Sequence, residues 1–397
     1  LRADAHAGLK NLSFSLDLSS KNVLPNNPYR ISSLKLHHFR NYESLSLECP
    51  ATPIVLTGKN GAGKTNILEA LSLLSPGKGL RKLRMGLLTR YGSDVPWVVH
   101  TTLTMPQGEI GISTGLESLK EEARRIVKIN GISHPQAILH EWVRILWQTP
   151  QSDYLFLEGM SIRRRFVDKL INQLTPSYSK HLYRYEYALR ERAQLLRDHS
   201  SDHRWLNVLE ETLAQESVAI VVDRMEFLSK INAEGEKNVT TFPKFFLESL
   251  GLVEAWLLES PALIVEEKIQ EALHKNRPTD SLTGGSKIGP HQSEIRVINL
   301  DYECPAEVCS TGEQKALLLS LMLAQSRLQL THCGVPPIIL LDEVLAHLDE
   351  GRRQHLFEEI LALNIQAWLT GTDQAIFEPL RGQAHFFTID RATARES

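Results

Sequence analysis

Residues 58–65 read Gly58-Lys59-Asn60-Gly61-Ala62-Gly63-Lys64-Thr65, and this stretch decides the fold. The apolar run Pro53-Ile54-Val55-Leu56 precedes it, and apolar residues at helical spacing follow it. A strand, a glycine-rich turn and a helix are the context that the motif G-x-x-x-x-G-K-[ST] requires. Main-chain N–H groups of such a turn and of the helix start bind phosphate. The stretch therefore predicts a nucleoside triphosphate site, with Lys64 on the β- and γ-phosphates and Thr65 on Mg²⁺.

A second apolar run, Ile338-Ile339-Leu340-Leu341, ends in two carboxylates, Asp342 and Glu343. A strand that is apolar on both faces is typical of the centre of a parallel sheet, and ligands bind at its carboxyl end. Asp342 then suits the Mg²⁺ site, and Glu343 suits polarisation of the attacking water. A strand that ends in a solvated acidic pair is the alternative, which the glycine-rich loop upstream disfavours.

Between these motifs, Ser310-Thr311-Gly312-Glu313-Gln314 precedes an apolar stretch, 316–324, that predicts a buried helix. Ser310 is a good N-cap, and Gly312 permits close approach of an anion to the helix start. Capping alone explains Ser310 but does not explain the order of the three motifs, which belongs to ABC-type ATPases. The D-loop of that class is then expected at 346–349 and the switch loop at 370–373.

Two positions of the ABC pattern stay open. The switch loop has no histidine, so Thr372 or Asp373 would replace it. The glutamine that helps to bind Mg²⁺ is either Gln148 or Gln151.

Composition indicates a globular protein of more than one domain. The chain has 397 residues, of which 42% are hydrophobic and 23% are charged. No apolar run approaches the ~18 residues of a membrane span. The four cysteines form no C-x-x-C pair and no metal-binding spacing, so reduced thiols and a cytoplasmic location are expected.

The formal net charge of −3 does not by itself indicate a nucleic-acid binder, but the basic residues are clustered. Segment 78–90 contains five basic residues and no acid, and segment 161–192 contains eight Lys or Arg against three acids. Local patches matter more to a phosphate backbone than total charge does. DNA contacts are predicted first at Lys78, Arg81 and Lys82, and second at Arg163, Arg164 and Arg165. Solvated surface charge is the alternative for each group, and the three arginines could instead brace the arm described next.

Periodicity divides the chain into a head and an insertion. Residues 1–29 are polar and are expected to be a disordered extension. Residues 31–47 predict a hairpin whose turn, with Arg40 and Asn41, is either a plain connection or a nucleotide contact. Helical patterns dominate 166–280, and 294–297 is expected to return to the head as a strand. The predicted fold class is α/β, an ABC-type P-loop ATPase domain (30–165 and 281–397, a strand-rich lobe plus a parallel-sheet core) with an inserted α-helical arm.

With these residues in view, the chain resembles the RecF family of bacterial recombination-repair ATPases, which are small relatives of the SMC proteins. The resemblance extends from about residue 31 to residue 390 and includes motifs at 39–42, 163–168, 289–291, 310–314 and 340–349. It departs from the family after Pro150, where relatives carry an acid and this chain has Gln151. It departs again after His291, which leaves His291 as either a functional residue or a packed one.

The resemblance implies ATP and Mg²⁺ as cofactors and a weak, DNA-stimulated ATPase activity. It also implies ATP-driven homodimerisation on double-stranded DNA and at single-strand gaps. The expected partners are RecR and RecO, so that RecA loads, in DNA repair, replication and the SOS response. Arg40, Ser310 and Gly312 join residues 58–65 as implied nucleotide contacts, and Gln151 joins Thr65 and Asp342 as an implied metal contact.

Two other functions fit the ABC pattern less well. A transporter nucleotide-binding subunit would need a membrane partner and would leave the inserted arm unexplained. An ABC-type nuclease would need a further acidic domain after residue 343.

Overall fold

The computed structural model describes residues 29–120, 124–150, 152–198, 202–237 and 241–396. The expected extension, 1–29, lies outside the described residues except for Tyr29. Tyr29 is 1% exposed, donates to the carbonyl of Trp142 at 2.9 Å and accepts from the N–H of Arg144 at 2.6 Å. Including Tyr29 in a disordered extension was therefore wrong, because its ring packs into the core of the head. No helix within these described ranges has the length and apolarity to cross a membrane.

A largely parallel sheet forms the centre of the head, in the order β15-β14-β3-β13-β12-β8. Alternate residues of β3 and β12 enter two different hydrophobic cores, one on each face of the sheet. This confirms the prediction that 338–341 is a central parallel strand. The strands are β3 (Ile54–Thr57), β8 (Ile145–Gln148), β12 (Ile338–Leu341), β13 (Ala367–Gly371), β14 (His385–Asp390) and β15 (Thr393–Glu396).

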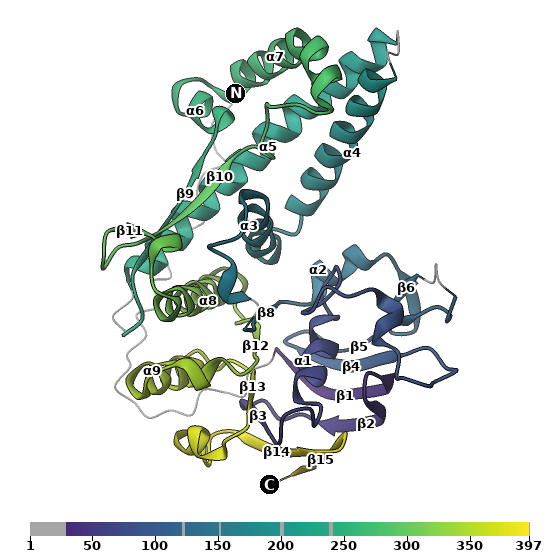
Figure 1. Cartoon of the computed structure of the whole chain (residues 1–397), viewed down its shortest axis with the longest axis vertical. Helices are drawn as coiled ribbons and strands as arrows, with labels where there is room; N and C mark the ends of the chain where they lie inside the picture. The colour runs from purple at the N-terminus through teal and green to yellow at the C-terminus, as the bar shows by residue number, and fades with distance from the viewer. Residues whose placement is uncertain (1–28, 121–123, 151, 199–201, 238–240, 397) are drawn as a thin grey trace, which may run out of the picture.

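An antiparallel sheet, ordered β2-β1-β4-β5-β6-β7, forms the strand-rich lobe. Helix α1 (Lys64–Ser72) contacts both β1 of this sheet and β13 of the parallel sheet, so it lies between them (Figure 1). The lobe therefore packs on α1. The predicted hairpin at 31–47 is confirmed. Its strands and the others of this sheet are β1 (Arg30–Phe39), β2 (Tyr42–Glu48), β4 (Val98–Met105), β5 (Gly108–Leu116), β6 (Arg125–Ile129) and β7 (Ile132–His134).

The other face of the parallel sheet is covered by α8 (Thr311–Cys333) and α9 (Glu350–Ala362) (Figure 1). Every residue of α8 from 316 to 326 is buried, which confirms the buried helix predicted there. Helix α8 also contacts the arm, so its sides are covered by both parts of the molecule. Short helices connect the larger elements: η1 (Met85–Leu88), η2 (Gln136–Ile138), α2 (Leu139–Trp142), η3 (Ser152–Tyr154), η4 (Ala306–Val308), η5 (Val344–His347) and η6 (Gln374–Leu380).

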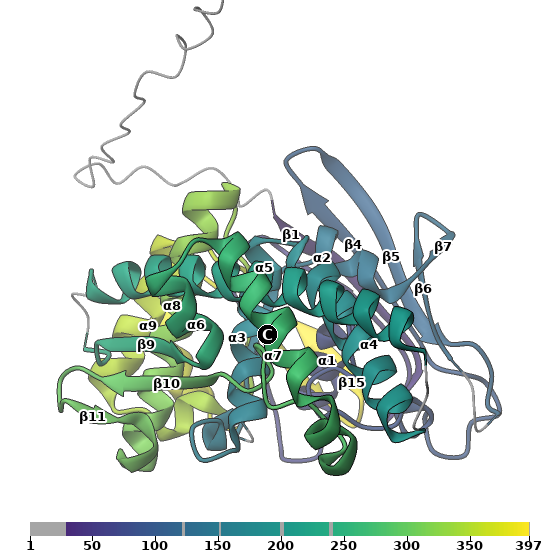
Figure 2. The same cartoon turned by 90° about the horizontal axis from the view of Figure 1, so that it is seen from above.

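The arm rises from the head in Figure 1 and is viewed from above in Figure 2. It is not purely helical, because β9 (Phe245–Leu250) lies within 166–280. The strand expected at 294–297 forms as β10 (Glu294–Asn299), but it pairs antiparallel with β9 and with β11 (Cys304–Pro305) instead of joining the parallel sheet. The helices are α3 (Met160–Leu174), α4 (Tyr178–Arg197), α5 (His203–Glu236), α6 (Leu252–Glu259) and α7 (Ala262–Thr283).

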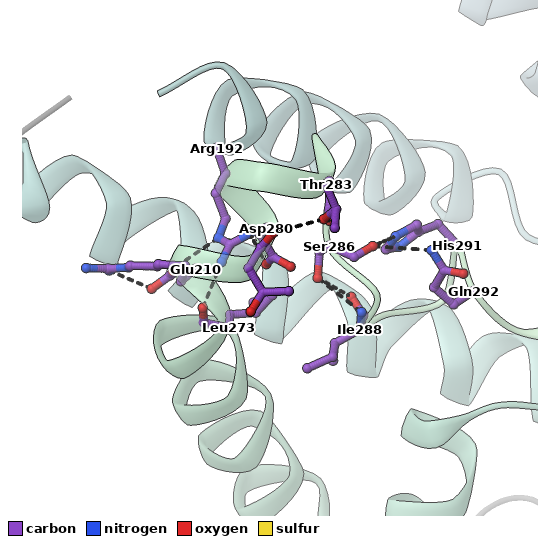
Figure 3. Close-up of polar contacts among 12 residues, drawn as sticks. Arg192, Glu210, Leu273, Asp280, Thr283, Ser286, Ile288, His291 and Gln292 are labelled. Atoms are coloured by element: carbon purple, nitrogen blue, oxygen red, sulfur yellow. Dashed lines mark hydrogen bonds and ion pairs between the residues drawn. The ribbon is translucent and has the colours of Figure 1, made fainter. Parts of the chain in front are cut away.

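A buried charge network ties three helices of the arm together (Figure 3). Arg192 on α4 donates to Glu210 on α5 and to Asp280 on α7, each at 2.8 Å, and to the carbonyl of Leu273 at 2.7 Å. Arg277 pairs with the other oxygen of Glu210 at 2.7 Å. At most 4% of each side chain is exposed for Arg192, Glu210 and Asp280. Burial removes the water that would stabilise these charges, so each charge is stabilised by its ion-pair partners instead.

We expect Arg192→Met to destabilise the arm by about 3–5 kcal/mol, because it removes the cation paired with the buried carboxylate of Asp280 and leaves Glu210 with Arg277 alone. The measurement is a urea titration that follows far-UV dichroism. Arg184→Met is the matched control on the same helix, since Arg184 is 65% exposed and pairs with Glu216 at 3.4 Å. Because the Arg184 guanidinium is largely exposed and the buried Glu216 keeps its contact with His181 at 2.6 Å, loss of Arg184 is expected to cost only about 0–1 kcal/mol. Equal effects of the two substitutions would contradict the structural role of the network.

His291, in the connection between α7 and β10, is a packed residue (Figure 3). Its Nδ1 lies 2.5 Å from the hydroxyl of Tyr185, and its Nε2 lies 2.8 Å from the carbonyl oxygen of Ser286. Burial lowers the pKa of His291, which the Ser286 carbonyl only partly offsets, so the ring is neutral near pH 7. Of the two alternatives for His291, the structure favours packing.

Candidate nucleotide-binding site

The carboxyl ends of four parallel strands meet at one edge of the sheet. The register pairs Gly371 with Thr57 and Leu341 with Gln148, so β13, β3, β12 and β8 end side by side. The glycine-rich loop follows β3, and the acidic pair 342–343 follows β12. Two motifs that are distant in sequence are therefore neighbours at the edge where parallel sheets bind ligands.

Two glycines of the loop occupy positions that cannot hold a side chain. Gly58 has a φ of +144°, and a Cβ there would lie 2.2 Å from the main-chain oxygen of Ile389. Gly63 has a φ of +121°, and a Cβ there would lie 2.5 Å from the hydroxyl of Tyr42. At Gly61, in contrast, a Cβ would meet nothing within 4 Å. The loop is thus held against β14 and β2 while its middle faces open space, which suits a phosphate group.

Lys64 begins α1, and its side chain turns back over the loop. Its Nζ donates to the carbonyl oxygens of Gly58 at 2.7 Å and Lys59 at 3.1 Å. Burial lowers the pKa of the ammonium, and the carboxylates of Glu343 and Asp342 partly offset this effect. The ammonium is therefore held among neutral acceptors at a place where a triphosphate would offer charged and stronger ones.

Thr65 joins the loop to the acidic end of β12. Its hydroxyl donates to Oδ1 of Asp342 at 2.8 Å, and the hydroxyl of Thr370 donates to the same oxygen at 2.9 Å. Mg²⁺ at phosphate sites takes one or two protein ligands and fills its other positions with water and phosphate oxygens. The neighbouring hydroxyl and carboxylate of Thr65 and Asp342 fit that requirement, so these two residues would hold the ion.

The main chain of Glu343 is held in a turn with a φ of +54°. Non-glycine residues in this left-handed region cost of order 1–3 kcal/mol and are concentrated at functional sites. The N–H of Glu343 donates to the hydroxyl of Thr370 at 2.9 Å, which secures the turn. Thr370 thus supports both acidic residues. Sequence reasoning included it only in the switch segment and did not identify this contact.

A surface hollow of about 460 Å³ opens beside the loop, lined by residues 58–60 and by Thr372. Asp373 instead caps the short helix η6, because its carboxylate accepts from the N–H of Ala375 at 2.9 Å. Of the two alternatives for the switch position, Thr372 is the one that lines this hollow, and its role in the switch stays a prediction.

Of the two candidate glutamines, only Gln148 lies among the described residues. Gln151 lies outside the described residues. Gln148 ends β8 and is 1% exposed. Its main-chain carbonyl oxygen accepts a hydrogen bond from the N–H of Asp342 at 3.0 Å. Gln148 is therefore a neighbour of the acidic strand end, and the choice between the two stays open.

The turn between β1 and β2 lies against the loop, but its two polar residues have different contacts. Arg40 makes a bidentate ion pair with Glu69, with N–O distances of 2.7 and 2.8 Å. Asn41 donates to the carbonyl of Ala62 at 3.1 Å and accepts from Asn66 at 2.8 Å. The structure therefore places Asn41 on the phosphate loop and directs Arg40 to α1, and a nucleotide contact by Arg40 stays a prediction.

Glu69 is a residue of this region that sequence reasoning missed. It lies on α1 and is 1% exposed. Besides its ion pair with Arg40, its Oε2 lies 3.6 Å from Nη1 of Arg81. A buried acid attracts cations from distant segments because its charge needs compensation. The available signal was an acid between Leu68 and Ala70 on the apolar side of a predicted helix.

The start of α8 presents the predicted signature to open space. The hydroxyl of Ser310 accepts from the N–H of Glu313 at 3.3 Å, which confirms the N-cap. Ser310 and Gly312 are exposed, and a Cβ on Gly312 would meet nothing within 4 Å. Arg352 on α9 bonds Glu313 at 2.9 Å and lies 3.7 Å from Asp349, so the signature segment is linked to the predicted D-loop.

The first basic cluster is divided between exposed and occupied side chains. Lys78 and Lys82 are exposed. Arg81 donates to Oδ1 of Asn66 at 3.3 Å and lies 3.6 Å from Glu69. Lys78 and Lys82 are therefore more available to a DNA phosphate than Arg81 is.

Arg125 holds the segment that precedes this cluster. Its guanidinium donates to the hydroxyl of Thr114 and to the carbonyl oxygens of Leu73, Ser75 and Gly77. Arg125 is 7% exposed, and burial lowers its pKa to about 10, so it stays charged at neutral pH. The chain leaving α1 is thereby fixed, and with it the approach to the basic cluster.

Arg163 and Arg164 are largely occupied by main-chain oxygens. Arg163 donates to the carbonyls of Ile295 at 3.0 Å and Glu158 at 2.7 Å. Arg164 donates to the carbonyl of Ser293 at 2.6 Å. Both residues join α3 to the segment at β10, so the structure favours the bracing alternative for them. Arg165 is exposed and bonds within its own helix, to the carbonyl oxygen and hydroxyl of Ser161.

Sequence comparisons identify proteins to which this chain is similar. The family model described as the RecF/RecN/SMC N terminal domain matches residues 30–390. A DNA replication and repair protein RecF from Mesorhizobium japonicum is 42% identical over 366 residues, which cover 91% of this chain and 97% of that protein. The protein of the same name from Brucella suis is 40% identical over 379 residues, 94% of this chain and 98% of that one.

Solved structures share the fold. One, described as the recombination mediator protein RecF with ATPrS in the RecFOR pathway, has a TM-score of 0.81 at 24% identity and covers 94% of this chain and 99% of that one. An Smc head domain with an extended coiled coil, from Pyrococcus furiosus, has a TM-score of 0.53 at 16% identity over 93% of this chain and 96% of that one. The α/β head with an inserted arm is thus the fold of RecF and of SMC heads.

Proposed function

Because the chain belongs to the RecF family, we propose that it is an ATP-dependent DNA-binding protein of recombinational repair and replication restart. Two copies would close on DNA, at duplex and at single-strand gaps, with ATP bound between them. Slow, DNA-stimulated hydrolysis would reset the dimer, and RecR with RecO would be recruited so that RecA loads. The descriptions of the relatives as DNA replication and repair proteins support this proposal and disfavour a transporter subunit or a nuclease.

One observation carries the dimeric part of the proposal. The glycine-rich loop meets Asp342 within one chain, whereas Ser310 and Gly312 at the start of α8 are exposed and face open space. A helix start with free N–H groups binds anions. A second copy would place its signature on the nucleotide of this chain. If the two copies are related by a two-fold axis, the signature of this chain would also meet the nucleotide of the other copy, because a two-fold interface repeats every contact.

The chemistry proposed for the site needs few groups. Lys64 would contact the β- and γ-phosphates, and Glu343 would accept a hydrogen bond from the attacking water. Mg²⁺, when bound by Thr65 and Asp342, supplies neutralisation of phosphate charge. The N–H groups of residues 58–65 would orient the triphosphate.

Sedimentation velocity with and without ATP tests the proposal, in the absence of DNA, with duplex DNA and with gapped DNA. The expected result is a monomer without ATP and a dimer with ATP, with the larger dimer fraction on DNA. A chain that stays monomeric with ATP and DNA together would contradict the sandwich.

We expect the double substitution Lys78→Ala and Lys82→Ala to weaken DNA binding equally for all sequences. Phosphate contacts carry no sequence information, and each lost duplex contact lowers the salt dependence, the slope of log K against log[salt], by about 0.9. The measurement is fluorescence anisotropy of labelled DNA over a range of salt concentrations with ATP present.

The control is the double substitution Lys128→Ala and Lys275→Ala, which removes the same charge from exposed positions on β6 and α7. The control is expected to leave the slope of the wild type unchanged. An unchanged slope in the Lys78 and Lys82 variant would remove this cluster from the DNA footprint.

A further inference from the structure

Cys304 and Cys309 lie side by side immediately before the signature segment. Their Sγ atoms are 3.5 Å apart, and both residues are partly exposed free thiols. Cys304 belongs to β11, and Cys309 directly precedes Ser310, the N-cap of α8. The N–H of Cys309 donates to the carbonyl of Ala306 at 3.2 Å, so the chain between the two cysteines forms a compact turn.

We propose that Cys304 and Cys309 are a peroxide-oxidisable pair, and that their intrachain disulfide displaces the start of α8 and lowers ATP-dependent dimerisation. A disulfide holds its sulfurs about 2.05 Å apart, so these two sulfurs must approach by roughly 1.5 Å. The short loop between the cysteines makes this closure entropically cheap. The effect on dimerisation rests on the function proposed above, whereas formation of the disulfide does not.

The chemistry proceeds in two balanced steps with hydrogen peroxide as the oxidant. Burial raises the pKa of Cys309 to about 11, and its hydrogen bond with Cys304 acts in the same direction. Cys309 therefore carries little thiolate at neutral pH, and the first step belongs to Cys304. The Cys304 thiol transfers two electrons to peroxide, becomes a sulfenic acid and releases water. The Cys309 sulfur then attacks the Cys304 sulfur, the S–S bond forms as the S–O bond breaks, and the hydroxyl leaves as water with the Cys309 proton.

The contacts of Cys309 explain how oxidation would reach the signature. Its carbonyl accepts from Nε2 of Gln314 at 3.0 Å, and its sulfur accepts from Nδ2 of Asn299 at 3.8 Å. Ser310 is the next residue, and its hydroxyl caps Glu313 at 3.3 Å. A move of about 1 Å toward Cys304 takes contacts of this length beyond hydrogen-bonding distance. A displacement of about 1 Å in a group that positions a reactant can lower the reaction rate about 100-fold.

Proteolysis at glutamate tests whether the disulfide forms. Glu307 lies between the two cysteines, so cleavage there separates them unless they are linked. The full chain is treated with hydrogen peroxide, free thiols are alkylated, and the glutamate-specific digest is analysed by mass spectrometry with and without reductant. The expected result is one linked species, which carries Cys304 and Cys309 and separates on reduction. Fragments that are already separate before reduction would overturn the proposal.

Sedimentation of the same samples with ATP tests the consequence. We expect oxidation to weaken dimerisation of the wild type at least about tenfold and reduction to restore it. Dimerisation of Cys304→Ser and of Cys309→Ser should not respond to peroxide, because neither variant can form the intrachain disulfide. Cys333→Ser, which removes a partly exposed thiol at the far end of α8, should respond as the wild type does.

The outcomes separate the two halves of the inference. A linked chain that dimerises as well as the reduced chain would overturn the effect on the signature and leave the proposed function intact. Failure of the reduced wild type to dimerise would overturn the proposed function and the effect on dimerisation together, while the digest still decides the disulfide.

Discussion

Glu343→Gln is expected to slow ATP hydrolysis by roughly 100-fold or more while ATP-dependent dimerisation persists. Glutamine keeps the size of the side chain and loses the carboxylate, so the attacking water loses its polarising acceptor, a contribution of typically 10²–10⁴-fold. Binding is spared because the loop, Lys64 and the pair Thr65 and Asp342 are unchanged. Phosphate release in the steady state measures the rate, and sedimentation with ATP measures the dimer, which should last longer than that of the wild type.

Glu350→Gln is the matched control, because Glu350 is an exposed acid in the first turn of α9 and the charge lost is the same. It should hydrolyse ATP at the wild-type rate. Wild-type turnover by Glu343→Gln would assign the polarisation of water to another residue.

Lys64→Ala is expected to abolish ATP-dependent dimerisation at ATP concentrations that saturate the wild type. The ammonium would make charge-assisted contacts to the triphosphate, and hydrogen bonds to charged groups contribute about 1.5–3 kcal/mol each. Loss of two such contacts weakens binding by more than 100-fold. Equilibrium binding of a fluorescent ATP analogue and sedimentation with ATP measure the two effects.

Removal of Lys64 also leaves the carbonyls of Gly58 and Lys59 without their donor, so the thermal unfolding midpoint has to be compared with that of the wild type. Lys128→Ala, an exposed lysine on β6, controls for the lost charge. Normal dimerisation of a folded Lys64→Ala variant would exclude a sandwich held through this loop.

Local signals made the motifs predictable. The glycine-rich loop needs glycine where the φ angle is positive and where β14 and β2 come close, and such requirements are visible as residue types. The apolar run at 338–341 indicated a strand covered on both faces, and Ser310 indicated a helix start. These features depend on a few neighbouring residues, so the sequence contains them directly.

Pairings between distant segments were not predictable in the same way. Arg40 pairs with Glu69, because Glu69 is buried and its charge needs a cation. Strand β10 pairs with β9. Both pairings depend on how the whole chain packs. The run at 245–250, Phe-Phe-Leu-Glu-Ser-Leu, is short and does not alternate, so its periodicity cannot distinguish a strand from a helix turn. The assignment of Arg163 and Arg164 likewise depended on which carbonyl oxygens lay within reach.

By itself the sequence determined the fold class, the phosphate loop, the acidic strand end and the capped signature helix, because each is encoded by residues that are close together in the chain. Only the tertiary structure decided that Thr65 and Thr370 share Asp342, that Arg40 turns to α1, and that the start of α8 faces open space. The physical reason is that these outcomes follow from the register of parallel strands and from the compensation of buried charge, which join residues that lie 28 to 277 positions apart and belong to different segments of the chain.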